Sequence, residues 1–134
     1  ALRMQRHCEN AERIAEFLMK HDKVAHVYYP GLQHHKGHEI AKRQMKHAGG
    51  MLSFSLKNDS VEAAISFMQK AHYFLLAESL GGVESLVGHP ATMTHAAIPL
   101  EIRQKTGVLD SLIRLSVGVE DIDDLLEDIE QALS

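Results

Sequence analysis

Hydrophobic residues recur every three or four positions at the start of the chain and predict an amphipathic helix over residues 1–20. Its apolar face is formed by Met4, Cys8, Ala11, Ala15 and Leu18. Charged residues mostly occupy the other faces of this helix. The β-branched and aromatic run at 24–29 predicts a short strand after it, and the Pro-Gly pair at 30–31 is typical of the turn that would end this strand.

Two helices and one strand are predicted in the next stretch of the chain. Good helix formers fill residues 38–47, and the paired glycines at 49–50 end that helix. Residues 51–56 alternate between large apolar side chains and serines, which predicts a strand with one packed face and one polar face. A second helix is predicted by the apolar stripe of Val61, Ala64, Ile65 and Met68, with Asp59 as its expected N-cap and Glu62 three residues later.

The last third of the chain is less regular. The continuous apolar run at 73–77 predicts a strand that is covered on both faces. Between 82 and 107 two prolines interrupt a weak pattern, which predicts a long structured loop with a helical turn at 100–104. Residues 112–117 predict the last strand, and the acidic run at 120–124 opens a final amphipathic helix.

This order of elements predicts one α/β domain over residues 1–134, an open sandwich in which four strands are interleaved with helices. The chain contains no internal repeat and no low-complexity tract. The pattern alone leaves the strand directions open, because both short connections and crossovers are possible here.

Composition removes several classes of function. The chain has 134 residues, with 14 Lys and Arg against 18 Asp and Glu, and no run of five like charges, so nucleic acid and anionic membranes are poor partners. No apolar run approaches the ~20 residues of a membrane span, and the first residues lack the apolar stretch of a signal peptide. One cysteine, Cys8, cannot form an internal disulfide. We therefore expect a cytoplasmic protein.

The chain contains 10 histidines, and histidine is a common metal ligand, so a metal-binding site is one interpretation. His34 and His38 are four residues apart, a spacing that lets two imidazoles on one helical turn share a cation. Gly37 and the preceding Pro-Gly pair disfavour a regular helix there, and no cysteine or carboxylate lies at ligand spacing. We therefore expect a solvated loop and no metal site.

Arg114 is the most informative charged residue. It lies among apolar neighbours in a predicted strand, where an unpaired charge would cost several kcal/mol. One interpretation is structural, an ion pair with an internal carboxylate or an edge strand from which the side chain reaches solvent. The other is functional, because the planar guanidinium can bind a substrate carboxylate through two parallel hydrogen bonds.

Glu78 and Ser79 form the second candidate feature. They follow the apolar run at 73–77 and precede paired glycines at 81–82, so they stand at the exit of a strand, where side chains often face a cleft. An ordinary turn is the alternative. The chain has no nucleophile elbow, phosphate-binding glycine loop or catalytic triad, so residue patterns alone support only a binding face.

Three long segments make the sequence resemble a known family. They are residues 77–86, Ala-Glu-Ser-Leu-Gly-Gly-Val-Glu-Ser-Leu, residues 89–95, His-Pro-Ala-Thr-Met-Thr-His, and residues 112–121, Leu-Ile-Arg-Leu-Ser-Val-Gly-Val-Glu-Asp. Shorter matches occur at 29–32, 41–44 and 49–54. Together they resemble the carboxy-terminal part of the Cys/Met-metabolism family of pyridoxal-phosphate enzymes, which includes cystathionine γ-synthases, γ-lyases and β-lyases and methionine γ-lyases.

The resemblance implies the small C-terminal domain of a fold-type-I enzyme. Its expected fold is a mainly antiparallel four-stranded sheet with helices on one face, with residues 1–20 forming the helix that leads in from a large domain. Arg114 resembles the arginine that binds the substrate α-carboxylate, Ser79 the serine beside the cofactor lysine, and Thr94 a hydroxyl that supports the same pocket. Glu78 matches an acidic residue that γ-synthases and γ-lyases direct towards the distal amino group of cystathionine. This match favours action on the Cγ–S bond.

One departure from the family limits this expectation. No segment here resembles the surroundings of the lysine that binds pyridoxal 5'-phosphate, which the family places in the large domain. The resemblance thus implies that this chain supplies substrate binding, is inactive alone, and belongs to a homo-oligomeric, usually tetrameric, enzyme acting on small amino acids. The alternative is a free-standing α/β regulatory module that binds a small amino acid through Arg114 without catalysis.

Overall fold

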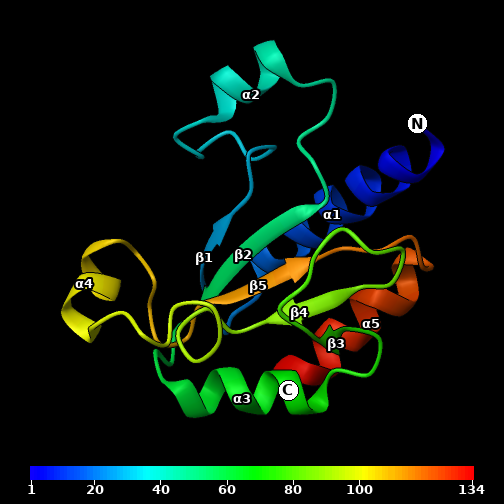
Figure 1. The fold of residues 1–134 in the computed structure, drawn as a ribbon. Coiled ribbons are helices and arrows are strands. Elements are labelled where there is room, and N and C mark those ends of the chain that lie inside the picture. The colour runs from blue at the N-terminus through cyan, green and yellow to red at the C-terminus, as the bar shows by residue number, and fades with distance from the viewer.

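The computed structural model of the protein describes all residues, 1–134, and has helices and strands in mixed order (Figure 1). The helices are α1 (Leu2–Lys20), α2 (His38–Gln44), α3 (Val61–Lys70), α4 (Leu100–Lys105) and α5 (Ile122–Leu133). The strands are β1 (Val24–Tyr28), β2 (Met51–Leu56), β3 (Leu75–Leu76), β4 (Leu86–Gly88) and β5 (Ile113–Ser116). The predicted α/β class is confirmed.

The sheet has five strands in the order β1-β2-β5-β4-β3, so the expected number of four is wrong. The additional strand is β4, which lies inside the stretch that the sequence predicts as loop. Every pairing is antiparallel except that of β3 with β4, which is parallel. The expectation of a mainly antiparallel sheet is therefore confirmed.

The predicted strand at 73–77 is also different from the expectation. Only Leu75 and Leu76 form β3, and they are 55% and 62% exposed rather than covered on both faces. The strand lies at the edge of the sheet, where one side has no neighbouring strand. Phe74 alone points into the core and is 2% exposed. The apolar run thus supplies one core residue and an exposed edge.

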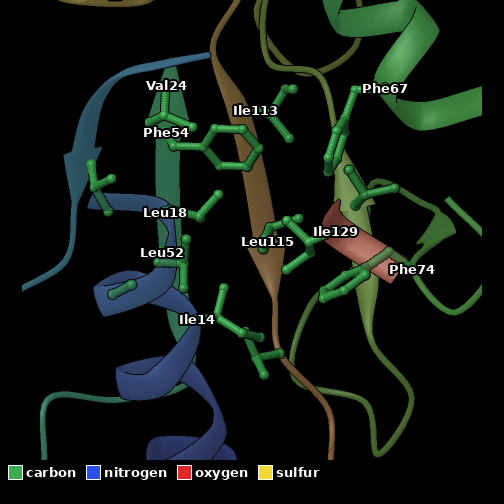
Figure 2. Close-up of a cluster of buried hydrophobic side chains, with 14 of the residues drawn as sticks. Ile14, Leu18, Val24, Leu52, Phe54, Phe67, Phe74, Ile113, Leu115 and Ile129 are labelled. Atoms are coloured by element: carbon green, nitrogen blue, oxygen red, sulfur yellow. The ribbon is translucent and has the colours of Figure 1, made fainter. Parts of the chain in front are cut away.

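Helices α1, α3 and α5 pack on one face of the sheet and enclose the hydrophobic core with it (Figures 1 and 2). The core cluster contains 22 buried residues. Figure 2 shows Ile14 and Leu18 of α1 facing Leu52 and Phe54 of β2, with Phe67 of α3 nearby. Burial of this apolar area is the main favourable contribution to folding.

Polar contacts fix α1 against the end of β5. His7 and Asn10, both buried, contact backbone oxygens of the segment that follows this strand. The Asn10 amide donates to the carbonyls of Gly118 at 3.1 Å and Glu120 at 3.0 Å. Buried polar side chains need such hydrogen-bond partners, so these contacts fix the position of α1 along the sheet.

The N-cap of α3 differs from the prediction. Ser60, not Asp59, caps the helix, and its hydroxyl accepts a hydrogen bond from the Ala63 N–H at 3.2 Å. The Asp59 carboxylate instead accepts the Ser111 N–H at 2.9 Å. Both residue types make good caps, and the long-range bond to Ser111 decides between them.

Two helices stand apart from the core, α2 beyond one end of the sheet and α4 beyond the other (Figure 1). Neither contains a buried residue. Apolar side chains on both remain largely exposed, including Ile40 and Ile102, each 51% exposed. No helix in the structure is long and apolar enough to span a membrane.

Candidate carboxylate-binding site

Arg114 lies on β5, the central strand of the sheet, opposite Ser53 of β2 and Gly88 of β4. Residues alternate between the two faces of a strand, so Arg114 and Ser116 point away from the helices while Leu115 points into the core. The sequence suggested an edge strand as one explanation for this arginine, and its central position excludes that explanation. The side chain is half-buried.

The guanidinium of Arg114 makes no ion pair within the chain. The three ion pairs of the structure join Arg13 to Asp123, His21 to Glu130 and Arg103 to Asp110. Nη2 of Arg114 instead donates to the backbone carbonyls of Glu78 at 3.1 Å and Ser79 at 3.2 Å. Nε and Nη1 have no acceptor in the chain, so these N–H groups remain available to a ligand.

The segment that carries Glu78 and Ser79 is tied to β5 at a second point. Ser116, two residues after Arg114 and on the same face, accepts the Gly81 N–H through its hydroxyl at 2.8 Å. Gly81 has φ +77°, a conformation that favours glycine. The two alternate side chains of β5 therefore hold this segment over the open face of the sheet.

The end of the same segment is fixed by a carboxylate. Glu120 accepts both the N–H and the hydroxyl of Ser85, at 2.6 and 2.9 Å. The Ser85 hydroxyl in turn accepts the Gly118 N–H at 2.8 Å. A Cβ at Gly118 would lie only 2.5 Å from the Val83 carbonyl oxygen, so no larger residue fits here. Residues 78–85 are thus held along their whole length.

Three of the four predicted site residues line one hollow. We call it the Arg114 hollow; its lining is Ala77, Glu78, Gly88, His89, Pro90, Met93, Thr94 and Arg114. The hollow is too narrow to admit a water molecule. These residues therefore do not form a complete ligand pocket by themselves.

Ser79 and Thr94 take different positions around Arg114. Ser79 is outside the lining and contacts Arg114 only through its backbone carbonyl. Thr94 is exposed and its hydroxyl lies 2.7 Å from Nδ1 of His95. The Glu78 carboxylate is exposed and has no hydrogen-bond partner in the chain, although its backbone carbonyl holds Arg114.

This arrangement can hold a ligand that carries both a carboxylate and an amine. A guanidinium with free N–H groups binds a carboxylate strongly, because charge-assisted hydrogen bonds are about twice as strong as neutral ones. A free carboxylate on the neighbouring segment, Glu78, can bind an ammonium group. The lining also contains two groups that can hold a proton, the Glu78 carboxylate and the His89 imidazole, but no lysine. The geometry of these residues supports binding and orientation of a ligand.

The residues present do not fit the reactive end of a pyridoxal cofactor. Such a cofactor reacts through an amine that forms an imine with a lysine side chain. Every lysine of this chain is exposed, and none lines the Arg114 hollow. No step that depends on a cofactor can therefore be assigned to these residues.

One buried histidine at this site was not predicted from the sequence. His89 is 0% exposed and lines the Arg114 hollow, yet the sequence shows it only as part of a motif. A histidine next to a proline in an irregular stretch carries no periodicity that would indicate burial. The signal that remained was the proximity of His89 to Thr94 within residues 89–95.

His34 and His38 are the two histidines whose spacing suggested a metal site. No group of three or more His, Cys, Asp or Glu side chains in the structure could hold a metal ion. His34 is exposed, and Nδ1 of His38 lies 2.9 Å from the Pro30 carbonyl. These two rings therefore have separate surroundings.

A raised pKa occurs away from the Arg114 hollow. Burial raises the pKa of the Tyr29 phenol well above its ordinary value, with smaller contributions from the nearby Cys8 and Glu12. The Tyr29 hydroxyl donates to the Gly49 carbonyl at 2.9 Å. Tyr29 lines a separate cleft of about 370 Å³ between α1 and α2.

Comparison with known proteins gives a family match over the whole chain. The family described as Cys/Met metabolism PLP-dependent enzyme matches residues 1–134. Cystathionine β-lyase from Lactococcus lactis subsp. cremoris is 59% identical over 99% of this chain, and cystathionine γ-lyase from Dictyostelium discoideum is 57% identical over 98%. The chain covers 34% of each, so it spans about a third of the length of these curated relatives.

A solved structure is similar in fold as well as in sequence. The crystal structure of cystathionine γ-synthase from Xanthomonas oryzae pv. oryzae, in complex with cystathionine, superimposes with a TM-score of 0.92 at 50% sequence identity. The match covers 98% of this chain and 34% of that protein.

Proposed function

The chain belongs to the Cys/Met metabolism family of pyridoxal-phosphate-dependent enzymes, and from that premise we propose that it is the substrate-binding part of such an enzyme. In this proposal Arg114 binds the α-carboxylate of a small amino acid. The remainder of a longer polypeptide supplies the lysine and the other groups that hold the cofactor. The length of the relatives supports this division, since this chain spans about a third of them.

The observation that carries the proposal is the unpaired guanidinium of Arg114. Arg114 lies half-buried on the central strand, and no carboxylate of the chain pairs with it. Two backbone carbonyls orient Nη2 while Nε and Nη1 stay free. A preoriented arginine without a counter-ion is well suited to a ligand carboxylate.

The substrate we propose is cystathionine, with reaction at its Cγ–S bond. Glu78 supports the finer assignment through the resemblance, because it matches the acidic residue that γ-synthases and γ-lyases direct towards the distal ammonium group of cystathionine. Its free carboxylate lies on the segment that Arg114 holds. Ser79 would lie beside the lysine supplied by the remainder of the protein, and Thr94 would support the same pocket. When bound, the cofactor supplies an electron sink that permits proton removal from Cα.

The proposal extends to the setting of the whole enzyme. We place it in the cytoplasm, where the single buried thiol of Cys8 would remain reduced. We also expect the full-length protein to be a homo-oligomer, most simply a tetramer. Exposed apolar residues such as Leu75 and Leu76 on β3 are available for contacts with surfaces outside this chain.

Replacement of Arg114 in the full-length protein tests the proposal. Arg114→Ala should lower kcat/KM for cystathionine. The decrease should correspond to a loss of about 2–4 kcal/mol of transition-state stabilisation, because the charge-assisted hydrogen bonds to the substrate carboxylate are lost. Arg114→Lys should recover only part of this loss, since an ammonium group cannot reproduce the planar fork. Steady-state kinetics measures both variants, and Arg43→Ala at an exposed site on α2 is the matched control. An unchanged kcat/KM in Arg114→Ala would contradict the proposed role.

The product of the same assay tests the bond assignment. Cleavage of the Cγ–S bond of cystathionine releases cysteine and leaves a four-carbon 2-oxo acid. Cleavage of the Cβ–S bond releases homocysteine and leaves pyruvate. We expect the four-carbon acid, and pyruvate as the main product would reassign the enzyme to β-elimination while leaving the role of Arg114 intact.

A further inference from the structure

His89 is the most buried ionisable side chain of the Arg114 hollow, with 0% exposure. It follows β4 directly, and both of its ring nitrogens have partners. Nδ1 lies 2.8 Å from the Thr92 hydroxyl, and Nε2 lies 2.7 Å from the Asp110 carbonyl. A ring held at both nitrogens cannot rotate without breaking buried hydrogen bonds.

The Asp110 carbonyl fixes one hydrogen of the ring. A carbonyl oxygen can only accept, so Nε2 of His89 must carry the hydrogen that is donated to Asp110. The Thr92 hydroxyl can donate to Nδ1 or accept from it, so it is a partner of Nδ1 in either role. A single orientation of the imidazole satisfies both contacts.

Arg103 completes a small network around this ring. Its Nη1 donates to the Ala91 carbonyl at 3.1 Å, and its Nη2 lies 3.6 Å from a carboxylate oxygen of Asp110. Asp110 is thus held through its backbone by His89 and through its side chain by Arg103. We call the four residues His89, Thr92, Arg103 and Asp110 the His89 brace.

The brace connects two parts of the Arg114 hollow. On one side, the turn that begins at His89 carries Met93 and Thr94, and the Met93 N–H donates to the His89 carbonyl at 3.0 Å. On the other side, Asp110 precedes β5, which carries Arg114. The bond from Nε2 to the Asp110 carbonyl therefore joins the turn to the strand that presents the guanidinium.

We propose that His89 is a positioning residue that sets the width of the carboxylate site by holding the 89–95 turn against β5. It touches no reacting atom in this role. Loss of its two hydrogen bonds releases the turn, so that Thr94 no longer keeps a fixed distance from Arg114. This inference rests on the proposed role of Arg114 and extends it to a residue that contributes no charge to the ligand.

The test compares two substitutions in the full-length protein. The side-chain amide nitrogen of glutamine can reach the position of Nε2 and donate to the Asp110 carbonyl, whereas leucine can make neither bond. His89→Leu should raise the KM for cystathionine about tenfold and change kcat by less than about threefold, and His89→Gln should restore most of the loss. His26→Leu, at an exposed histidine of β1, is the matched control and should change neither constant.

The outcomes separate this inference from the proposed function. An active His89→Leu enzyme with an unchanged KM, or a His89→Gln enzyme as impaired as His89→Leu, would overturn the positioning role and leave Arg114 unaffected. If His89→Leu does not accumulate, Thr92→Val removes the partner of Nδ1 at an exposed position and should raise KM about threefold. An unchanged KM in that variant would likewise overturn the role.

A second readout does not depend on turnover. Nitrogen NMR of histidine-labelled full-length protein should show His89 with a protonated Nε2 whose hydrogen is protected from exchange with water. A ring that averages between tautomers would overturn the inference even if the protein has no activity on cystathionine. Absence of activity with a fixed tautomer would instead refute only the proposed function.

Discussion

At the scale of single residues, burial of polar groups determines much of the behaviour of this chain. Tyr29 is 1% exposed, and its hydroxyl donates to the Gly49 carbonyl. Burial raises the pKa of this phenol, because the phenolate would lose its solvation. The unfolded chain releases this proton at lower pH than the folded chain, so the free energy of unfolding must fall as pH rises above about 10.

Tyr29→Phe tests this linkage. The variant lacks the titrating group, so its free energy of unfolding should decline between pH 9 and pH 11 by about 1 kcal/mol less than that of the parent. At neutral pH it should be less stable by about 1 kcal/mol, because the hydrogen bond to Gly49 is lost. Urea unfolding at several pH values measures both effects. Tyr73→Phe, at an exposed tyrosine, should keep the full decline, and an equal decline in Tyr29→Phe would refute the argument.

The residues of the candidate site show which of its features sequence patterns can predict and which they cannot. Arg114 stood out because a charge interrupts an apolar strand, and the structure excludes both an edge strand and an internal ion pair for it. The contacts of its Nη2 with the carbonyls of Glu78 and Ser79 could not be predicted, because they depend on how residues 78–85 fold over the sheet. His89 was missed because it lies next to a proline in an irregular stretch, where no periodicity indicates burial.

At the scale of elements, long periodic segments were predictable and short irregular ones were not. The sequence predicts a buried stripe of Ile122, Leu125, Leu126 and Ile129 on helix α5; three of these residues are buried, and Leu126 is only half-buried. Strand β4 has three residues, too few to show a period, and ends in a glycine. Its formation depends on pairing with β5, a long-range interaction that no local pattern contains.

The position of β3 depends on one buried carboxylate of α5. Asp128 is 3% exposed and accepts the backbone N–H groups of His72 at 2.8 Å and Tyr73 at 2.8 Å. It also accepts the Phe74 N–H at 3.3 Å. These bonds fix the residues immediately before β3 and hence the path of the chain towards Glu78. A helix therefore contributes to the site without reaching it.

Asp128→Ala should destabilise the fold by about 2–4 kcal/mol, because it leaves buried N–H groups without an acceptor. Glu127→Ala, at the exposed neighbouring position of the same helix, should change the free energy of unfolding by less than about 0.5 kcal/mol. Urea unfolding measures the two variants side by side. Equal midpoints for Asp128→Ala and Glu127→Ala would show that the carboxylate contributes nothing to the fold.

At the scale of the whole molecule, the chain has a large hydrophobic core but no complete pocket around Arg114. The core cluster brings together residues from three helices and the sheet. The Arg114 hollow, in contrast, has no space for a water molecule. The family match explains this contrast, since the chain spans about a third of its curated relatives. Only the resemblance to the family predicted that part of the site would lie outside this chain. Residue patterns carry no information about residues that the chain does not contain.

The chain alone should therefore show little ligand chemistry. We expect no release of a 2-oxo acid from cystathionine by the isolated chain, because no lysine lines the hollow. Calorimetry with cystathionine, methionine and cysteine should give dissociation constants weaker than about 1 mM, since an incomplete pocket buries little of a ligand. Turnover by the isolated chain would refute the division of labour. Micromolar binding without turnover would support a free-standing regulatory module instead.

The segment that contains α4, between the 89–95 turn and Asp110, has a consequence for how the protein can evolve. The chain leaves the site after the 89–95 turn and returns at Asp110, and the His89 brace holds these two points together. The segment between them contains α4, whose residues are all exposed except Arg103 of the brace (Figure 1). Insertions or deletions that leave Arg103 in place would cost little free energy of folding, because loop length carries a small entropic penalty. The exposed parts of this segment can therefore diverge among homologues, or accept a grafted peptide, while Arg103 and the geometry around Arg114 are retained.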